Sequence, residues 1–323
     1  MGYLEKSSNI ILKQCMNLKE NESCLVVTDS KLKQIGNALY KNTLKITKKS
    51  KLILTEIPKT HGTEPSKNIA DEMLKYDAVL LATTKSLSHT RARKNTSKKG
   101  ARIASMPGIT IDMMSRALNI DFNKIKTINK KLIKKLQNKN KIKIITNKGT
   151  KIEFILKGRK WTSDDGIYTK KGAFGNLPSG EVFVAPLENL TSGTIIVDAS
   201  VASLGKVDKN VKIDVKDGFI VDVKGGKISN YLKNLLKNKL SKNVAELGIG
   251  TNYKAKITGN VLEDEKVAGT CHIAFGNNKH FGGEIDVPFH LDVVIKNPTI
   301  YADNVLIMKN GKNKFVGVQR NPT

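Results

Sequence analysis

Short apolar runs alternate with segments of helical composition over the first 120 or so residues of the chain. The apolar runs are strand-like, end in turn or capping residues, and cover 24–28, 52–55, 78–83 and 102–106. The segments of helical composition lie between them, at 31–40, 64–75 and 90–99. Strands that alternate with helices predict a mainly parallel sheet with crossover helices, and therefore an α/β domain.

The pattern changes near residue 124. Ile and Leu recur at helical spacing among lysines over 124–143, and many short strands with glycine turns follow. Residues 141–156 have the pattern of a hairpin around Asn147-Lys-Gly, and a helix is expected over 229–242. We therefore predict an α/β domain over 1–124 and a strand-rich α+β domain over 125–323.

The formal net charge of +27 raises the question of a nucleic-acid partner. Six of the 56 basic residues are arginines, whereas phosphate and base recognition favours the planar arginine fork. The lysines are spread along the whole chain, and aromatic residues, which stack on single strands, make up 5% of it. The 124–143 segment is more typical of a solvated helix face, so we expect no nucleic-acid partner despite the charge.

The ends and the cysteines indicate the compartment. The N-terminus has no apolar signal core, and no stretch approaches the roughly 20 apolar residues that cross a bilayer. Cys15, Cys24 and Cys271 form no close pair, which argues against a disulfide framework and a structural zinc finger. We predict a cytoplasmic protein without a membrane partner.

Residues 246–292 hold three of the five histidines and seven glycines. His290 and Asp292 are two apart in an apolar strand, so their side chains point to the same face and can bind one ion. His272 and Glu246 lie inside two further apolar runs that end in glycine. Because an unpaired buried charge costs several kcal/mol, a shared cation explains all of these groups together.

Two other segments belong with this predicted site. Glu181 follows a Pro-Ser-Gly turn and starts an apolar strand, which supplies a fifth ligand and allows two metal ions. Residues 84–93 follow a predicted parallel strand, at the sheet edge where ligands gather, and contain His89, Arg91 and Arg93. Ser88 to Thr90 also fit the N-cap of the next helix.

The motifs Asn176-Leu-Pro-Ser-Gly-Glu, Glu246-Leu-Gly-Ile-Gly-Thr-Asn, Asp264-Glu-Lys, Gly269-Thr-Cys-His and His290-Leu-Asp resemble, in that order, those of thermophilic metallo-aminopeptidases of the T and S type. With Ser86-Leu-Ser-His-Thr-Arg, they look like the short archaeal and bacterial branch of this family. The resemblance implies a homodimer that hydrolyses the N-terminal residues of peptides. It also implies a dinuclear zinc, cobalt or manganese centre in the second domain, held by Glu181, Glu246, His272, His290 and Asp292.

Lys279 stands where the longer aminopeptidases have a catalytic tyrosine, seven residues beyond His272. The tyrosine would donate a hydrogen bond in the transition state, and His280, Lys279 or Tyr253 could replace it. Glu263, Glu265 and Glu284 are candidates for the general base or for recognition of the substrate amine.

An alternative from another enzyme class is 2,5-dihydroxypyridine 5,6-dioxygenase, which the chain resembles in its shorter length. In that family a single iron(II) would be held by Glu246, His290 and Asp292, with positions open for a small-molecule substrate and oxygen. His89 would then be the acid/base group. A third alternative is a lysine-rich nucleic-acid binder on an enzyme scaffold that has lost its activity.

Overall fold

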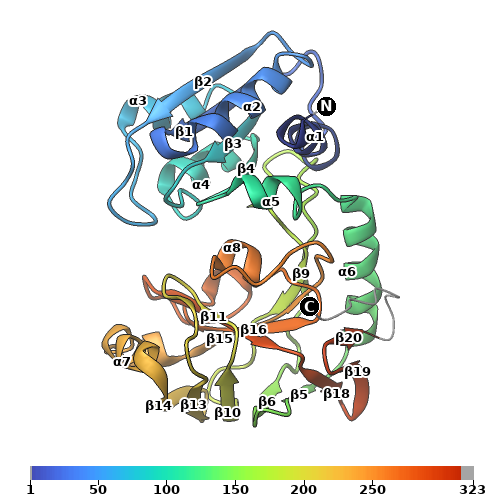
Figure 1. Ribbon diagram of the computed structural model, residues 1–323, viewed down its shortest axis with the longest axis vertical. Helices are drawn as coiled ribbons and strands as arrows, with labels where there is room; N and C mark the ends of the chain where they lie inside the picture. Colours follow the sequence, from blue (N-terminus) through green and yellow to red (C-terminus); the bar gives the residue numbers. More distant parts are fainter. Residues whose placement is uncertain (1, 314–323) are drawn as a thin grey trace. The chain divides into compact units, whose positions relative to one another are not determined.

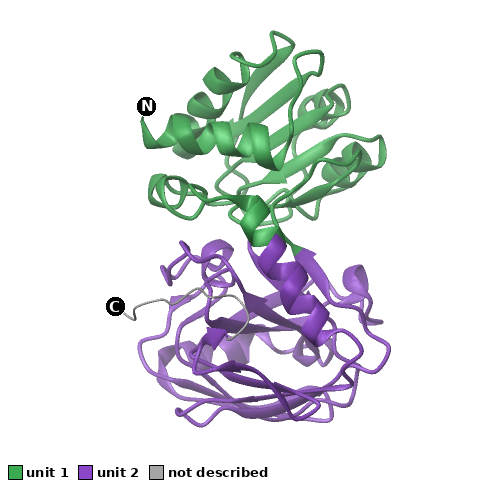
Figure 2. Cartoon of the chain, turned by 90° about the vertical axis from the view of Figure 1, so that its right-hand side faces the viewer, with its two compact units in different colours: residues 1–126, 164–179 green, residues 127–163, 180–323 purple. Residues whose placement is uncertain are grey.

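The computed structural model describes residues 2–313 (Figure 1). The chain forms two compact units (Figure 2). Unit 1 contains the chain up to Lys126 together with Asp164–Ser179, and unit 2 contains Thr127–Ser163 and the chain from Gly180 onward. The sequence predicted two domains that follow one another, 1–124 and 125–323. In the structure, residues 164–179 belong to unit 1 as well, so the chain passes between the units more than once.

Unit 1 is built on a five-stranded sheet in which each resolved pair is parallel. In spatial order the strands are β2 (Ser50–Thr55), β1 (Cys24–Asp29), β3 (Ala78–Ala82), β4 (Arg102–Ser105) and β8 (Phe174–Asn176). The first four coincide with the apolar runs of the sequence, so the predicted α/β domain with a parallel sheet is confirmed. The fifth strand comes from the returning segment.

Helices precede, connect and follow these strands. They are α1 (Tyr3–Ile10), the π-helical η1 (Ile11–Cys15), η2 (Ser30–Leu32), α2 (Lys33–Thr43), α3 (Lys67–Met73), α4 (Arg91–Lys98) and α5 (Ile111–Ser115). Thr90 caps α4, because its side chain accepts a hydrogen bond from the Arg93 backbone N–H. This confirms the capping role considered for the 88–90 segment.

Unit 2 contains two sheets, whose resolved pairs are antiparallel. The eight-stranded sheet has the order β14 (Phe219–Lys224), β13 (Val211–Lys216), β10 (Ser192–Val197), β6 (Lys151–Ile155), β5 (Lys141–Ile145), β18 (Thr299–Ala302), β19 (Val305–Lys309) and β20 (Lys312–Asn313). The seven-stranded sheet has the order β12 (Gly205–Lys206), β11 (Ser200–Val201), β17 (His290–Lys296), β16 (Thr270–Gly276), β15 (Val244–Gly250), β9 (Glu181–Val184) and β7 (Thr162–Asp164). The strand-rich α+β character of this part is confirmed, as is the β5–β6 hairpin.

Helices accompany the sheets. They are α6 (Phe122–Leu136), which begins in unit 1 and ends in unit 2, α7 (Gly226–Leu235), η3 (Leu240–Lys242), α8 (Val261–Asp264) and η4 (Lys279–Phe281). Among the described residues, no helix is both long enough and apolar enough to cross a membrane.

The core of unit 2 lies between its two sheets. Phe154 and Ile195 of the eight-stranded sheet belong to the same buried cluster as Leu247, Ile273 and Val293 of the seven-stranded sheet. Each such side chain contributes about 1.5–3 kcal/mol when it is fully buried. Because side chains alternate along a strand, the neighbouring residues of β15, β16 and β17 face away from this core.

Candidate metal centre

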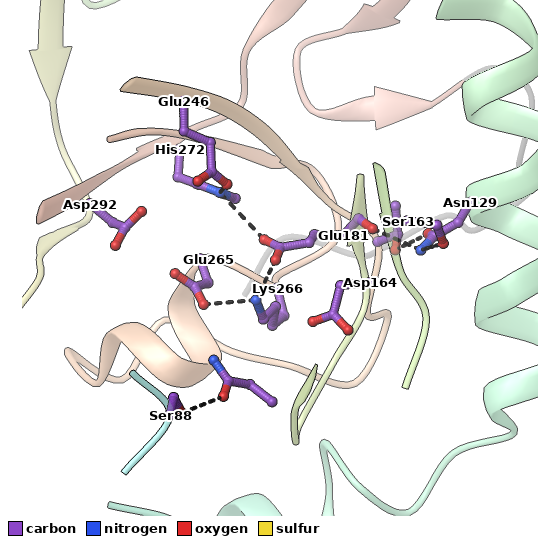
Figure 3. Close-up of polar contacts among 12 residues, drawn as sticks. Ser88, Asn129, Ser163, Asp164, Glu181, Glu246, Glu265, Lys266, His272 and Asp292 are labelled. Carbon is purple, nitrogen blue, oxygen red and sulfur yellow. Dashed lines mark hydrogen bonds and ion pairs between the residues drawn. The ribbon is translucent and has the colours of Figure 1, made fainter. Parts of the chain in front are cut away.

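Five ligand-type side chains project from one face of four adjacent strands, and Figure 3 shows four of them, Glu181, Glu246, His272 and Asp292. They are Glu181 on β9, Glu246 on β15, His272 on β16, and His290 and Asp292 on β17. Ala274 is paired with both Glu246 and Asp292, which puts the two carboxylates on the same face. Each histidine is two residues from one of these positions and therefore shares the face. The structure brings all five predicted metal ligands together.

Small residues on the same face make room for this cluster. Gly248 is paired with His272, and a Cβ atom at position 248 would lie 2.0 Å from the Cε1 and Nε2 atoms of that imidazole. Gly250 is paired with Glu181, and a Cβ atom there would lie 2.1 Å from the Val267 carbonyl oxygen. The glycine-rich β15 strand is therefore needed for both the histidine and the neighbouring backbone.

Glu246 connects the two histidines. Its Oε1 atom lies 3.3 Å from His272 Nε2, and its Oε2 atom lies 3.5 Å from His290 Nε2. His290 Nε2 is also 3.5 Å from Asp292 Oδ1. Glu246 and Asp292 are buried, whereas the His290 side chain is 32% exposed. This edge of the cluster is open to solvent.

The His290 ring has a defined orientation. Its Nδ1 atom lies 3.0 Å from the Asn277 carbonyl oxygen, which can only accept, so Nδ1 carries the hydrogen. Nε2 then faces the carboxylates, as in metal sites where a hydrogen bond to one ring nitrogen presents the other to the ion. Phe281 packs edge-on against the same ring, at 6.0 Å between centroids.

The carboxylates change the pKa of both histidines. Burial lowers the pKa of His272, but the hydrogen bond to Glu246 and the charge of Glu181 outweigh it and raise the pKa to about 9. Burial likewise opposes the charge on His290, but Asp292 and then Glu246 raise its pKa to about 10. Before an ion binds, the histidines therefore hold protons that a metal must displace.

Three groups in this cluster have the donors for a metal ion, with their ligand atoms within 4.8 Å of one another. They are Glu181, Glu246 and His272; Glu246, His290 and Asp292; and Glu265, His272 and Asp292. Glu246 is shared by the first two groups. The geometry thus supports a metal-binding protein, with carboxylate oxygen and imidazole nitrogen as the ligands.

A buried lysine also enters the cluster. The Lys266 side chain is 2% exposed, and its Nζ atom lies 2.5 Å from Glu181 Oε1 and 2.7 Å from Glu265 Oε1 (Figure 3). Burial raises the pKa of the Glu265 carboxyl. Two of the carboxylates are therefore already paired with a cation that the chain itself supplies.

A second network fixes the backbone at the start of β9. Asn129 on α6 is fully buried, and its Nδ2 atom donates to the Glu181 carbonyl oxygen at 2.8 Å and to Ser163 Oγ at 3.0 Å. Its side-chain oxygen accepts a hydrogen bond from the Thr251 hydroxyl at 2.6 Å. The helix thereby ties the ends of β7, β9 and β15 together.

Three of the predicted catalytic residues have different surroundings. Glu265 lies in the cluster and pairs with Lys266. His280 is exposed on η4, and within residues 2–313 no hydrogen bond or ion pair joins it to the five ligands. His89 lies in unit 1, exposed, in the loop before α4. The catalytic roles of these residues remain predictions.

Arg91 and Arg93, which the sequence predicted in the same segment, lie in the first turn of α4 and serve the local structure. Arg93 donates from Nε to the Ser88 carbonyl oxygen at 2.6 Å, and its guanidinium lies 4.0 Å from the centre of the Phe174 ring. Arg91 is exposed, 3.8 Å from Glu64.

Asn277 and Phe281 were not predicted from the sequence, and Lys266 entered only as the last residue of the Asp264-Glu-Lys motif, without a role. That motif does not reveal that the Lys266 side chain is buried, in a chain with 50 lysines. Asn277 acts through its backbone carbonyl, which carries no residue-specific signal. Phe281 is the one of these residues that could have been suspected from the sequence, because it is an aromatic residue close to the predicted ligand strand with His290.

Comparisons with known proteins give a consistent picture. The sequence profile of the NicX family, 2,5-dihydroxypyridine 5,6-dioxygenase, matches residues 10–314. The 2,5-dihydroxypyridine 5,6-dioxygenase of Pseudomonas putida KT2440 is 24% identical over 262 residues, which cover 76% of this chain and 73% of that protein.

Two solved structures share the fold. The 2,5-dihydroxypyridine dioxygenase from Pseudomonas putida KT2440 superposes with a TM-score of 0.79 at 19% identity, covering 96% of both chains. AmpT from Thermus thermophilus superposes with a TM-score of 0.72 at 15% identity, covering 97% of this chain and 99% of that one.

These comparisons overturn the main functional prediction from the sequence. The expected aminopeptidase, and with it the hydrolase and protease class, is wrong, because the family profile and the sequence relative both describe a dioxygenase. The likeness to AmpT, at 15% identity, shows a common fold. The error has a physical source, since glutamate, histidine and aspartate on adjacent strands serve hydrolytic and oxidative metal centres equally well.

Proposed function

The chain belongs to the 2,5-dihydroxypyridine 5,6-dioxygenase family, and on this premise we propose that it is a mononuclear iron(II) dioxygenase that opens an aromatic ring. The substrate we propose is a small dihydroxylated aromatic heterocycle, the class named for its relatives.

The observation that carries the proposal is the grouping of Glu246, His290 and Asp292. One nitrogen and two carboxylate oxygens from adjacent strands form a three-ligand set close to the facial triad of non-haem iron(II) enzymes, which leaves coordination positions open. The tautomer of His290, fixed by Asn277, presents Nε2 to the set. The residues present therefore fit such an ion.

Iron(II), when bound, would carry out the chemistry with molecular oxygen, for which protein side chains are poorly suited. The chain's own residues hold and orient the ion. Glu246 and Asp292 contribute two negative charges, and burial keeps these carboxylates away from water. His290, at the solvent-open edge, contributes a neutral ligand once its proton has left.

An aromatic row beside the ligands supports an aromatic substrate. Phe183 on β9 packs edge-on against Phe281, with 5.7 Å between ring centroids, and Phe281 in turn packs edge-on against His290. Aromatic rings favour such edge-to-face contacts over direct stacking, so a planar substrate next to His290 would find matching partners.

The test is oxygen uptake by the iron(II)-loaded protein with 2,5-dihydroxypyridine. We expect one equivalent of oxygen consumed per ring opened, no turnover after His290→Ala, and retained turnover after Glu181→Gln, since Glu181 lies outside the proposed set. Iron content measured on the same samples separates loss of the ion from loss of chemistry.

The opposite result is equally clear. If the loaded protein consumed no oxygen with dihydroxylated pyridines or benzenes while holding one iron per chain, the ring-opening function would be refuted. Oxygen uptake that survives His290→Ala with full iron content would refute the ligand set.

A further inference from the structure

Lys266 occupies an unusual place for a cation. The side chain is 2% exposed, and its ammonium contacts the carboxylates of Glu181 and Glu265 in the floor of the metal cluster. A buried ammonium is costly unless acidic partners compensate it, and here two do so.

The backbone holds this lysine in place. The Lys266 carbonyl accepts a hydrogen bond from the Asn252 N–H at 2.8 Å, and its own N–H donates to the Glu263 carbonyl at 3.0 Å. The following peptide lies so close to β15 that a Cβ atom at Gly250 would meet the Val267 oxygen at 2.1 Å. The packing of this segment therefore directs the ammonium toward the cluster.

The two carboxylates that Lys266 contacts belong to two of the three groups of possible metal ligands, and the third group contains neither. Glu181 completes the group with Glu246 and His272, and Glu265 completes the group with His272 and Asp292. The group that contains His290 uses neither of them. Lys266 thus neutralises one carboxylate in each alternative group and leaves the proposed iron ligands untouched.

We propose that Lys266 takes the place of a second metal ion and limits the centre to one ion per chain. A divalent cation bound through Glu181 would share that carboxylate with a buried ammonium, and two like charges at such short range repel strongly where water does not screen them. The proposal rests on the proposed function only in identifying the first ion's ligands. What it adds is that the charge of Lys266 prevents a second ion from binding.

The experiment counts manganese(II), a stable probe, in the full chain after equilibration and desalting. Lys266→Met keeps the length of the side chain and removes its charge, so we expect this variant to bind one more ion than the wild type. Because Glu246 belongs to both ligand groups, the two ions would lie close together, and their electron paramagnetic resonance signal should show the coupling of a manganese pair. Lys266→Arg keeps the charge and should bind the wild-type number.

Two double variants locate the added ion. Lys266→Met with Glu181→Gln should return to the wild-type count, whereas Lys266→Met with His290→Ala should keep the added ion. Lys279→Met is the matched surface control, because Lys279 is 57% exposed and pairs with Asp286. It should leave the count unchanged.

An unchanged count in Lys266→Met, or an added ion that persists without Glu181, would overturn the proposal. A wild type that binds no manganese would refute the proposed ligand set, but an ion gained by Lys266→Met would still support the role of Lys266. Should Lys266→Met fail to fold, Lys266→Met with Glu265→Gln removes one unpaired carboxylate as well and carries the same expectation.

Discussion

Gly248 is the residue whose missing side chain matters most to the metal cluster. The His272 ring lies over it, and its Nε2 atom is 3.3 Å from both Glu181 Oε2 and Glu246 Oε1. Any side chain at position 248 must displace the imidazole from between the two carboxylates. A glycine inside an otherwise apolar strand is thus explained by close packing rather than by backbone conformation.

Gly248→Ala is expected to lower the free energy of unfolding by about 1–3 kcal/mol, the usual cost of overpacking a filled site. Urea unfolding followed by the fluorescence of Trp161, the one tryptophan of the chain, reports on unit 2. Gly2→Ala, at an ordinary φ of −66° with open space around it, is the control and should change little. Equal stability of the two variants would contradict the steric explanation.

Glu22 and Arg102 form a second residue-level constraint, in unit 1. The carboxylate accepts two hydrogen bonds of 2.7 Å from the guanidinium, whose side chain is 8% exposed. This fork lowers the pKa of Glu22 below 4.5. Stability from this pair is therefore complete above about pH 4.5 and is lost as the pH falls through the lowered pKa.

Glu22→Gln should cost about 2 kcal/mol at neutral pH, since it leaves Arg102 without its counter-charge, with some relief because Glu22 is partly exposed. The difference from the wild type should shrink as acid protonates the native carboxyl. Circular dichroism during unfolding at pH 7 and pH 3 measures both values. Glu5→Gln, at an exposed pair with Lys45, serves as the control, and a pH-independent difference would exclude the ionic explanation.

Residue types predicted which side chains come together but could not decide the chemistry. Glu181, Glu246, His272 and Asp292 converge as their placement in apolar runs predicts, because a buried charge needs a partner. Lys266 also pairs with Glu181, and this ion pair could not be predicted from the Asp264-Glu-Lys motif, because it joins segments far apart in the sequence. The dinuclear metal centre was predicted by counting five ligands, without the Lys266 ammonium that pairs with one of them.

Helix α6 supports the site through the backbone of Glu181 rather than through its carboxylate. Asn129 holds the Glu181 backbone and Thr251 through one amide group. Asn129→Ala would leave a buried carbonyl and a buried hydroxyl without these hydrogen bonds, at a cost of about 2–3 kcal/mol. Trp161 fluorescence during urea unfolding measures this loss of stability. Lys130→Ala, at an exposed position on the same helix, is the control and should stay within about 0.5 kcal/mol of the wild type.

The turn η4 makes a testable contribution to substrate binding. Phe281 is the ring between Phe183 and His290, so Phe281→Ala should weaken binding of an aromatic substrate by roughly 2- to 10-fold, the worth of one aromatic pair. The Michaelis constant and the iron content should be measured together. A loss of iron with an unchanged Michaelis constant would mean that Phe281 orients His290 instead.

Short elements limited the prediction of the fold. The strands of the parallel sheet have long apolar runs and were located from the sequence, whereas β8 spans Phe174–Asn176, three residues without a recognisable pattern. Its pairing with β4 depends on a tertiary contact between distant segments. The return of residues 164–179 to unit 1 could not follow from local periodicity for the same reason.

For the whole molecule, metal binding should be visible as stability. An ion present at 100 times its dissociation constant stabilises the native state by about 2.7 kcal/mol, so iron(II) or manganese(II) should raise the melting temperature and a chelator should reverse the change. The same titration with His290→Ala should give no shift. A shift that is equal in both proteins would place the ion elsewhere.

The fold alone was compatible with both chemistries. The same architecture is found in the dioxygenase of Pseudomonas putida and in AmpT, so architecture could not choose between them. The excess of lysine did not help either, because it is spread over both units. Assembly as a homodimer remains a prediction from the sequence.

The late return of the chain to unit 1 has a consequence for how the protein is made. A ribosome releases the four strands β1 to β4 by residue 105, but β8 follows only at 174–176. At 5–20 residues per second, the edge of β4 stays uncovered for roughly 4–14 seconds of synthesis. During that interval the nascent chain exposes an unpaired parallel strand, the kind of edge that pairs with other chains, so this protein should depend on chaperones more than the final fold suggests.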